Sequence, residues 1–195
     1  MSPIRKHPSE EQQLSDRLRA LRLERQLSLA ALASKTGLTK GFLSQIERGA
    51  KIPSISTLLK VAQALGVAVG TLFEGSARID VPYSLVRRRE RKRFAREGSL
   101  HGYNYESIAF RKKTKKMEPF VMVPPRSAPR TLFDHDGDEM IYVLSGRLEL
   151  RLGNETIVLR PGDCIYFDAS IGHHSRSMGR RAAQALVVVS SLGAS

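Results

Sequence analysis

The chain has 195 residues, of which 41% are hydrophobic, and a formal net charge of +13. This length is enough for two small domains, each with its own core. The sequence has no apolar run of about 18 residues or more and no leader segment, so it predicts neither a membrane span nor a signal peptide. The single cysteine, Cys164, excludes an internal disulfide framework and fits the reducing cytoplasm. Its place in an apolar strand favours a packing role over that of a nucleophile.

The positive charge lies in the first part of the chain. The net charge is +5 for residues 1–75, +9 for residues 76–116 and −1 for residues 117–195. Because neutralised phosphates supply most of the non-specific affinity for nucleic acids, this distribution favours a nucleic-acid partner. The densest basic runs, 87–93 and 111–116, either contact a DNA backbone or form solvated loops between strands.

Residues 28–49 have the pattern of a helix, a tight turn and a second helix. Ser28 is a suitable N-cap for the first helix, in which apolar residues recur at helical spacing. Gly37 supplies the permissive backbone that a sharp turn between helices needs, and Thr39 caps the second helix. The sequence therefore predicts two short helices joined at Gly37.

The second predicted helix has an apolar and a polar side. Leu43 and Ile46 face a core, whereas the outward face is short, polar and rich in hydrogen-bond donors, which suits base edges in a major groove. The residues of the outward face are Lys40, Gly41, Ser44 and Gln45. The alternative is an ordinary helical hairpin with a solvated face.

Residues 12–74, with the ending LSQIERG, closely resemble the helix-turn-helix of the Cro/repressor (XRE) family. The resemblance implies an all-α DNA-binding domain of five helices over 12–75, the last one a short turn around Val69–Phe73. Where the family often has a phosphate-contacting glutamine, this chain has Leu29. We expect Lys40 and Gln45 to contact bases, Gly41 to allow close approach and Ser44 to reach a base or a phosphate, and Ser28, Thr39 and Arg48 to hold the DNA backbone.

From about Tyr83 onward strand signals replace the helical period. Short apolar or alternating runs predict strands, and Gly153-Asn154 predicts a tight hairpin between two of them. The strands are expected near residues 103–110, 120–123, 140–144, 147–152, 156–159, 164–167 and 182–190. This pattern predicts an antiparallel sandwich or barrel, so the fold class is α+β with two domains.

The segment from His135 to Glu139, followed by Gly146, resembles the first cupin motif, and residues 159–173, ending in His173, resemble the second. The resemblance implies an all-β cupin domain (a double-stranded β-helix, or jelly roll) over 99–192, joined by a basic linker and barrel entry over 76–98. The whole chain is similar to bacterial regulators that join an XRE domain to a cupin sensor.

Three residues of the cupin motifs are candidate metal ligands. Positions 135 and 139 share strand parity, so His135 and Glu139 are expected on one side of a sheet, where they converge with His173. Two imidazoles and a carboxylate suit Fe(II), and Zn, Mn or Ni are alternatives. Phe133 stands where metal-binding cupins commonly have another histidine. In the alternative interpretation both histidines are hydrogen-bonded polar residues that line a metal-free pocket.

Tyr103 and Tyr105 either offer hydroxyls to a ligand in that pocket or are core residues with satisfied hydroxyls. The resemblances imply a cytoplasmic, homodimeric regulator that binds a double-stranded DNA operator and senses a small-molecule effector, a metal or both. The alternative is a cupin metalloenzyme with a vestigial helix-turn-helix domain, similar to the non-haem iron epoxidase of fosfomycin synthesis. Gln26 stands where such enzymes have a lysine directed at the metal.

Overall fold

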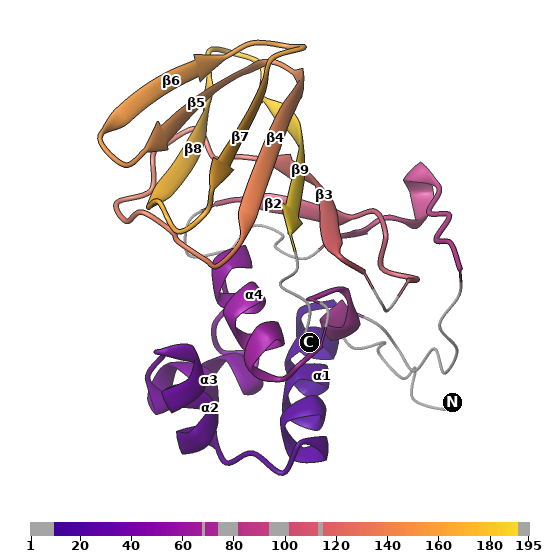
Figure 1. The fold of residues 1–195 in the computed structure, drawn as a ribbon. Helices are drawn as coiled ribbons and strands as arrows, with labels where there is room; N and C mark the ends of the chain where they lie inside the picture. The colour runs from indigo at the N-terminus through magenta and orange to yellow at the C-terminus, as the bar shows by residue number, and fades with distance from the viewer. Residues whose placement is uncertain (1–9, 68, 74–81, 94–101, 113–114, 191–195) are drawn as a thin grey trace, which may run out of the picture.

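The computed structural model describes residues 10–67, 69–73, 82–93, 102–112 and 115–190. A helical domain at the N-terminal end is followed by a β-sheet domain, which confirms the α+β layout with two domains (Figure 1). The predicted domain boundaries at 75–76 and 98–99, and the predicted end at 192, lie outside the described residues.

The described part of the helical domain has four α-helices: α1 (Glu10–Glu24), α2 (Leu29–Thr36), α3 (Lys40–Glu47) and α4 (Ile55–Ala64). Ser28 and Thr39 cap α2 and α3, because their hydroxyl oxygens accept hydrogen bonds from Ala31 N at 3.0 Å and Phe42 N at 3.1 Å. Gly37 ends α2 in the left-handed region, with φ at 67°. Both predicted caps and the predicted turn are confirmed.

The prediction of five helices was wrong, because the fifth segment is the 3₁₀ helix η1 (Val69–Phe73). Five residues close at most one α-helical hydrogen-bonded ring, so the tighter 3₁₀ pattern satisfies more of the backbone. The N–H of Gly70 lies 3.3 Å from Glu118 Oε1 of the β domain, where it donates a hydrogen bond outside the helix. The helical core is built from Leu18, Leu32, Leu43, Ile46, Leu58 and Leu72.

The β domain is a sandwich of two antiparallel sheets. The larger sheet has the order β1-β2-β3-β9-β4-β7 and the smaller one β6-β5-β8. The strands are β1 (Lys92–Arg93), β2 (Asn104–Ser107), β3 (Met117–Val123), β4 (Asp138–Ser145), β5 (Arg147–Leu152), β6 (Glu155–Leu159), β7 (Cys164–Asp168), β8 (His173–Met178) and β9 (Gln184–Ser190). The predicted hairpin is β5–β6, and Phe120, Ile141, Leu148 and Leu150 fill the space between the sheets.

Cys164 does not have the predicted packing role. It is exposed at the start of β7, together with Tyr166, whereas Phe167 is the buried residue of this strand. Alternate residues of a strand face opposite sides of a sheet. The apolar run was therefore correctly assigned to a strand, but the cysteine lies on its outer face.

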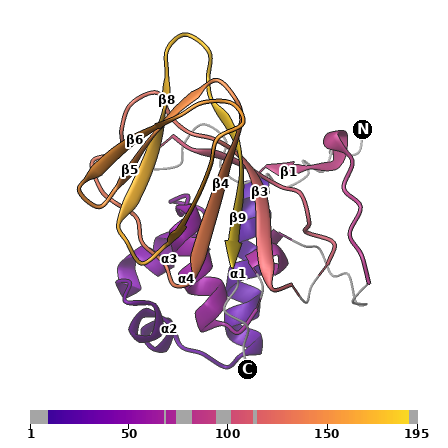
Figure 2. The ribbon, with the colours of Figure 1, turned by 45° about the horizontal axis from the view of Figure 1, so that its top comes forward.

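Helix α4 lies directly beneath the β domain, next to the ends of β4 and β9 (Figures 1 and 2). In both views α2 and α3 are on the side of the molecule away from the 3₁₀ helix η2 (Arg88–Glu90), which belongs to the first basic run. Among the described residues, no helix has the length and hydropathy that a membrane crossing requires.

Candidate functional site

Helix α3 presents the predicted DNA-reading residues on one side. Leu43 and Ile46 are fully buried against the other helices, so the opposite side of α3 faces outward. The predicted contact residues are exposed, namely Ser28, Thr39, Lys40, Gly41 and Arg48, or half-buried, namely Ser44 and Gln45. A Cβ added at Gly41 would meet no atom within 4 Å, so this part of α3 is open to close approach.

A buried ion pair holds the C-terminal end of α3. Arg22 of α1 contacts Glu47 through Nε–Oε1 at 2.6 Å and Nη2–Oε2 at 2.9 Å, and its Nη1 donates to Leu27 O at 2.7 Å. The hydrogen bond to Glu47 raises the pKa of Arg22. Removing one partner of such a pair costs about 3–5 kcal/mol. The glutamate in the LSQIERG ending is the sequence signal of this contact, but its partner Arg22 is not predicted from the sequence.

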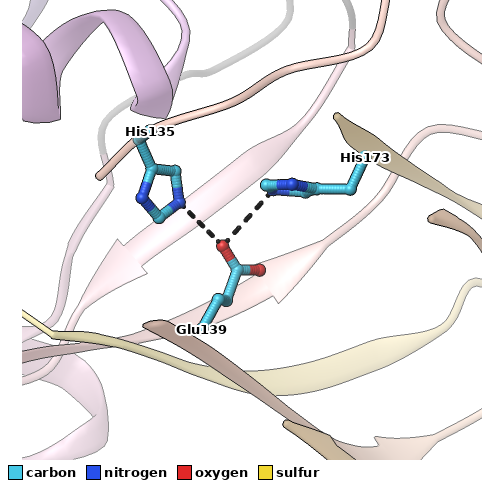
Figure 3. A group of neighbouring side chains, drawn as sticks. All are labelled: His135, Glu139 and His173. Atoms are coloured by element: carbon cyan, nitrogen blue, oxygen red, sulfur yellow. Dashed lines mark hydrogen bonds and ion pairs between the residues drawn. The ribbon is translucent and has the colours of Figure 1, made fainter. Parts of the chain in front are cut away.

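The candidate metal centre brings together His135, Glu139 and His173, all of them buried (Figure 3). Both Nε2 atoms face the same carboxylate oxygen, Glu139 Oε2, at 3.0 Å for His135 and 3.5 Å for His173. The predicted convergence is therefore present. The expected strand parity does not explain this convergence, because β4 begins at Asp138 and His135 lies in the loop before it.

The hydrogen bonds of both imidazoles indicate where their protons lie. Nδ1 of His135 is 3.1 Å from Asp136 O, and Nδ1 of His173 is 2.9 Å from Ile171 O. A carbonyl oxygen only accepts, so this bonding assigns a proton to each Nδ1. In the neutral imidazoles the lone pairs are then on Nε2, directed at an anionic oxygen. Such an arrangement is stable only with a proton or another cation between the three atoms.

The pKa shifts of Glu139 and His173 both favour the charged form of the side chain. Burial favours a higher pKa for Glu139, but hydrogen bonds from His135 and His173 outweigh burial and leave the pKa lowered. Burial favours a lower pKa for His173, but its hydrogen bond to Glu139 and the charge of that carboxylate leave the pKa raised. The site therefore favours positive charge next to the carboxylate.

The donor set fits a divalent metal ion. All three ligand atoms lie within 4.8 Å of one another. Two donors, each about 2.1 Å from a metal, are about 3.0–3.4 Å apart for bond angles between octahedral and tetrahedral values. The measured separations from Glu139 Oε2 to the two Nε2 atoms are close to this range. Backbone carbonyls that hold each Nδ1 are the outer contacts that orient metal-binding histidines.

One aromatic ring packs against a ligand of the centre, and a second aromatic residue is bonded to the same ligand through its backbone. The ring of Phe167 lies 5.0 Å from that of His173, centroid to centroid. Phe133, in the place of the additional histidine of other cupins, pairs with His173 through two backbone hydrogen bonds of 2.8 Å. The described residues thus offer three ligands, one of them packed against the ring of Phe167.

The two candidate ligand-binding tyrosines are buried, with their rings stacked 5.7 Å apart. The hydroxyl of Tyr103 donates to Ser175 O at 2.8 Å and accepts from Ser175 N at 2.7 Å. Burial raises the pKa of Tyr103 to about 12 and that of Tyr105 well above its ordinary value. Tyr103 lies directly before β2, and its hydroxyl is bonded to Ser175 of β8. It therefore matches the interpretation as a core residue with a satisfied hydroxyl.

Comparison with known proteins agrees with both halves of the chain. A helix-turn-helix family model matches residues 18–72, and a cupin domain model matches residues 119–189. The HTH-type transcriptional regulator SutR of Escherichia coli (strain K12) is 27% identical over 168 residues, which cover 86% of this chain and 89% of SutR.

Two solved structures align over nearly the whole chain. An HTH_3 family transcriptional regulator from Vibrio cholerae aligns with a TM-score of 0.67 at 24% identity and covers 92% of this chain and 96% of its own. The hydroxypropylphosphonic acid epoxidase from S. wedmorenis aligns with a TM-score of 0.47 at 20% identity, over 92% of this chain and 97% of its own. The first of these alignments supports the fold.

Proposed function

Because this chain joins a helix-turn-helix domain to a cupin domain, we propose that it is a DNA-binding transcriptional regulator whose cupin domain senses a small metabolite, a metal ion or both. The observation that carries the proposal is the outward face of α3, with Lys40, Gly41 and Arg48 exposed while Arg22 and Glu47 fix the helix from behind. A relative that aligns over most of the chain is named as a transcriptional regulator, which supports it.

In this proposal the regulator acts as a homodimer on a double-stranded operator. One small helix-turn-helix domain reads few bases, whereas two related by a two-fold axis read half-sites about one DNA turn apart. Lys40 and Gln45 contact base edges, Ser44 reaches a base or a phosphate, and Gly41 allows close approach. Ser28, Thr39 and Arg48 hold the backbone.

The cupin domain supplies the sensor. His135, Glu139 and His173 hold a divalent ion, with Fe, Zn, Mn and Ni as candidates. When bound, such an ion offers open coordination positions to an oxygen or nitrogen atom of an effector. The chain's own residues orient the ligands through Asp136 O and Ile171 O and place the ring of Phe167 against His173.

In the first step of the test, the full chain is used to select the sequences that it binds from a random double-stranded DNA library. Lys40→Ala and Gln45→Ala should then each weaken binding to the selected site by about 1–3 kcal/mol. Arg181→Ala is the control, because it removes a charge from the exposed turn between β8 and β9, at the far end of the barrel. Selection of no sequence, or equal affinities for all variants, contradicts the proposal.

The metalloenzyme alternative uses the same two histidines and one carboxylate, and this donor set is the observation in its favour. It requires iron-dependent turnover of a substrate that Glu139→Ala abolishes, whereas the regulator requires none. Gln26, where such enzymes have a lysine, lies in the exposed turn after α1.

A further inference from the structure

We propose that Lys60 and Gln63 of helix α4 are positioning residues for the His135 side of the metal centre, and that through them metal binding in the barrel and operator binding by the helical domain are coupled. The coupling to the operator rests on the function proposed above. The positioning of His135 does not.

Helix α4 contacts the residues on both sides of His135. Lys60 Nζ lies 3.0 Å from Asp134 Oδ2, and Gln63 Nε2 donates to Asp136 Oδ2 at 3.1 Å. Side chains three residues apart lie on the same face of a helix, so this face of α4 bridges the loop at two points. The metal ligand lies between the two contacted residues in the sequence.

Asp136 connects the helix directly to the imidazole. Its side chain accepts the hydrogen bond from Gln63, and its backbone carbonyl accepts the Nδ1 proton of His135. A displacement of Asp136 by α4 therefore turns the ring whose Nε2 faces Glu139. Outer contacts of this kind set the orientation and basicity of metal-binding histidines.

The far side of the same loop is fixed to the barrel. The N–H of Asp138 donates to Ser190 Oγ at 2.8 Å, and the N–H of His135 donates to Ala169 O at 3.0 Å. Gly137 has φ at 89°, and a Cβ there would lie 2.4 Å from Ser190 Oγ. The backbone of the loop thus has support from the barrel at His135 and Asp138, so a shift of α4 acts through the side chains of Asp134 and Asp136, which α4 contacts.

Helix α4 is also part of the helix-turn-helix core. Leu58, Val61 and Ala62 are buried in the helical domain, while Lys60 and Gln63 point to the barrel. Helix α4 packs against α2, and α2 packs against α3. A change in the angle between α4 and the barrel is therefore transmitted through packed helices to the DNA-reading helix.

The joint between the domains is not completely filled by side chains. A small pocket of about 50 Å³ lies between them, lined by Leu59, Gln63 and Val69 on the helical side and by Glu118, His135 and Asp136 on the barrel side, among others. Lys60 and Asp134 have side chains that are 34% and 59% exposed. Exposed contacts contribute little to stability, so variants of Lys60 and Gln63 should fold.

The first experiment measures Zn(II) affinity of the full chain by competition with a chromogenic chelator. Gln63→Ala, which changes no charge, should weaken Zn(II) binding about fivefold, because Gln63 acts on the metal ligand through one exposed contact to Asp136. In Lys60→Ala/Gln63→Ala the lost positive charge would by itself tighten binding, so weaker binding there reports lost positioning. Lys35→Ala, on the exposed end of α2, is the charge-matched control. Affinities within about twofold of the wild type, or no Zn(II) binding by the wild type, overturn the proposal.

A second readout needs no metal. In the metal-free chain, the amide of His135 should exchange with solvent faster in Gln63→Ala than in the wild type or Lys35→Ala, because the loop has lost its contact with α4, whereas the amide of Asp138, held by Ser190 Oγ, should not change. Unchanged exchange at the amide of His135 overturns the positioning role.

The third measurement tests the coupling to DNA. Zn(II) should change the operator affinity of the wild type about fivefold or more, and should change that of Gln63→Ala much less. Equal operator affinities of the wild type with and without Zn(II) overturn the coupling while the proposed function stands. If the wild type binds no operator, the proposed function fails, and the Zn(II) affinities and amide exchange still decide the positioning role.

Discussion

At the scale of single residues, the candidate metal centre depends on a carboxylate that holds two imidazoles. The resemblance to cupin motifs identified His135, Glu139 and His173, and the structure brings their ligand atoms together. The sequence could not reveal Asp136 O and Ile171 O as the partners of each Nδ1, because backbone acceptors leave no mark on residue type. Because these partners hold a proton on each Nδ1, the lone pairs lie on Nε2 and the site favours a cation. The identities of the three ligand residues alone do not establish this preference.

The pair of Glu139 and His173 makes the stability of the metal-free protein depend on pH. The raised pKa of His173 gives a contribution that is complete below about pH 6.5 and is lost as pH rises through the folded-state pKa. The lowered pKa of Glu139 gives a contribution that is complete above about pH 4.3 and is lost as pH falls through the folded-state pKa. The stability difference between the wild type and Glu139→Gln should therefore be largest between about pH 4.3 and 6.5. Urea unfolding with EDTA at several pH values measures it, and a difference independent of pH contradicts the assignment.

Tyr103→Phe separates a structural from a ligand-binding role of this tyrosine. Loss of the hydroxyl leaves the N–H and the carbonyl of Ser175 without their buried partner, which should cost about 1–3 kcal/mol of the free energy of unfolding. Zn(II) affinity should not change, because the hydroxyl is engaged with Ser175. A variant with unchanged stability and weaker binding of an effector would instead support the ligand-binding prediction.

At the scale of elements, the sequence predicts contacts between near neighbours in the chain better than contacts between residues far apart in the chain. Ser28, Gly37 and Thr39 define their helices through neighbours three residues away or less, and such signals are visible in the sequence. Arg22 and Glu47 are 25 residues apart, and Lys60 and Asp134 are 74 apart. No periodicity connects such pairs. The same limit applies to η1, whose Gly70 donates to Glu118 in the other domain.

Gly41 allows the fold of α3 to be tested apart from its DNA-reading role. Gly41→Ala should stabilise the free protein by at most roughly 0.5 kcal/mol, because alanine favours a helix, Gly41 lies in the first turn of α3 and the added Cβ meets no atom within 4 Å. The same Cβ should weaken operator binding if the α3 backbone approaches the base edges there. Thermal unfolding and operator titration measure the two effects. A stabilised variant with wild-type operator affinity contradicts the close approach of Gly41 to DNA.

At the scale of the whole molecule, the predicted DNA-reading helix and the first basic run lie apart. Helix α3 belongs to residues 1–75, whose net charge is +5, whereas η2, from the first basic run, lies on the other side of the molecule (Figures 1 and 2). Arg91 and Arg93 form ion pairs with Glu106, and Arg111 with Glu90. Of the two interpretations of this run, the structure therefore favours a solvated, partly paired surface over a contact with the DNA bound by α3 of the same chain.

The salt dependence of operator binding tests whether Arg48 at the end of α3, or η2, contacts DNA phosphates. Each phosphate contact that is lost lowers the slope of log K against log salt by about 0.9 for duplex DNA. Arg48→Ala should reduce the slope by about this amount per bound chain, because Arg48 is expected to hold the backbone. Arg88→Ala/Arg89→Ala removes more charge but should leave both the slope and the affinity unchanged, because η2 is remote from α3. A slope that falls in the double variant would show that this basic run contacts phosphate after all, on DNA held by a second copy or wrapped around the chain.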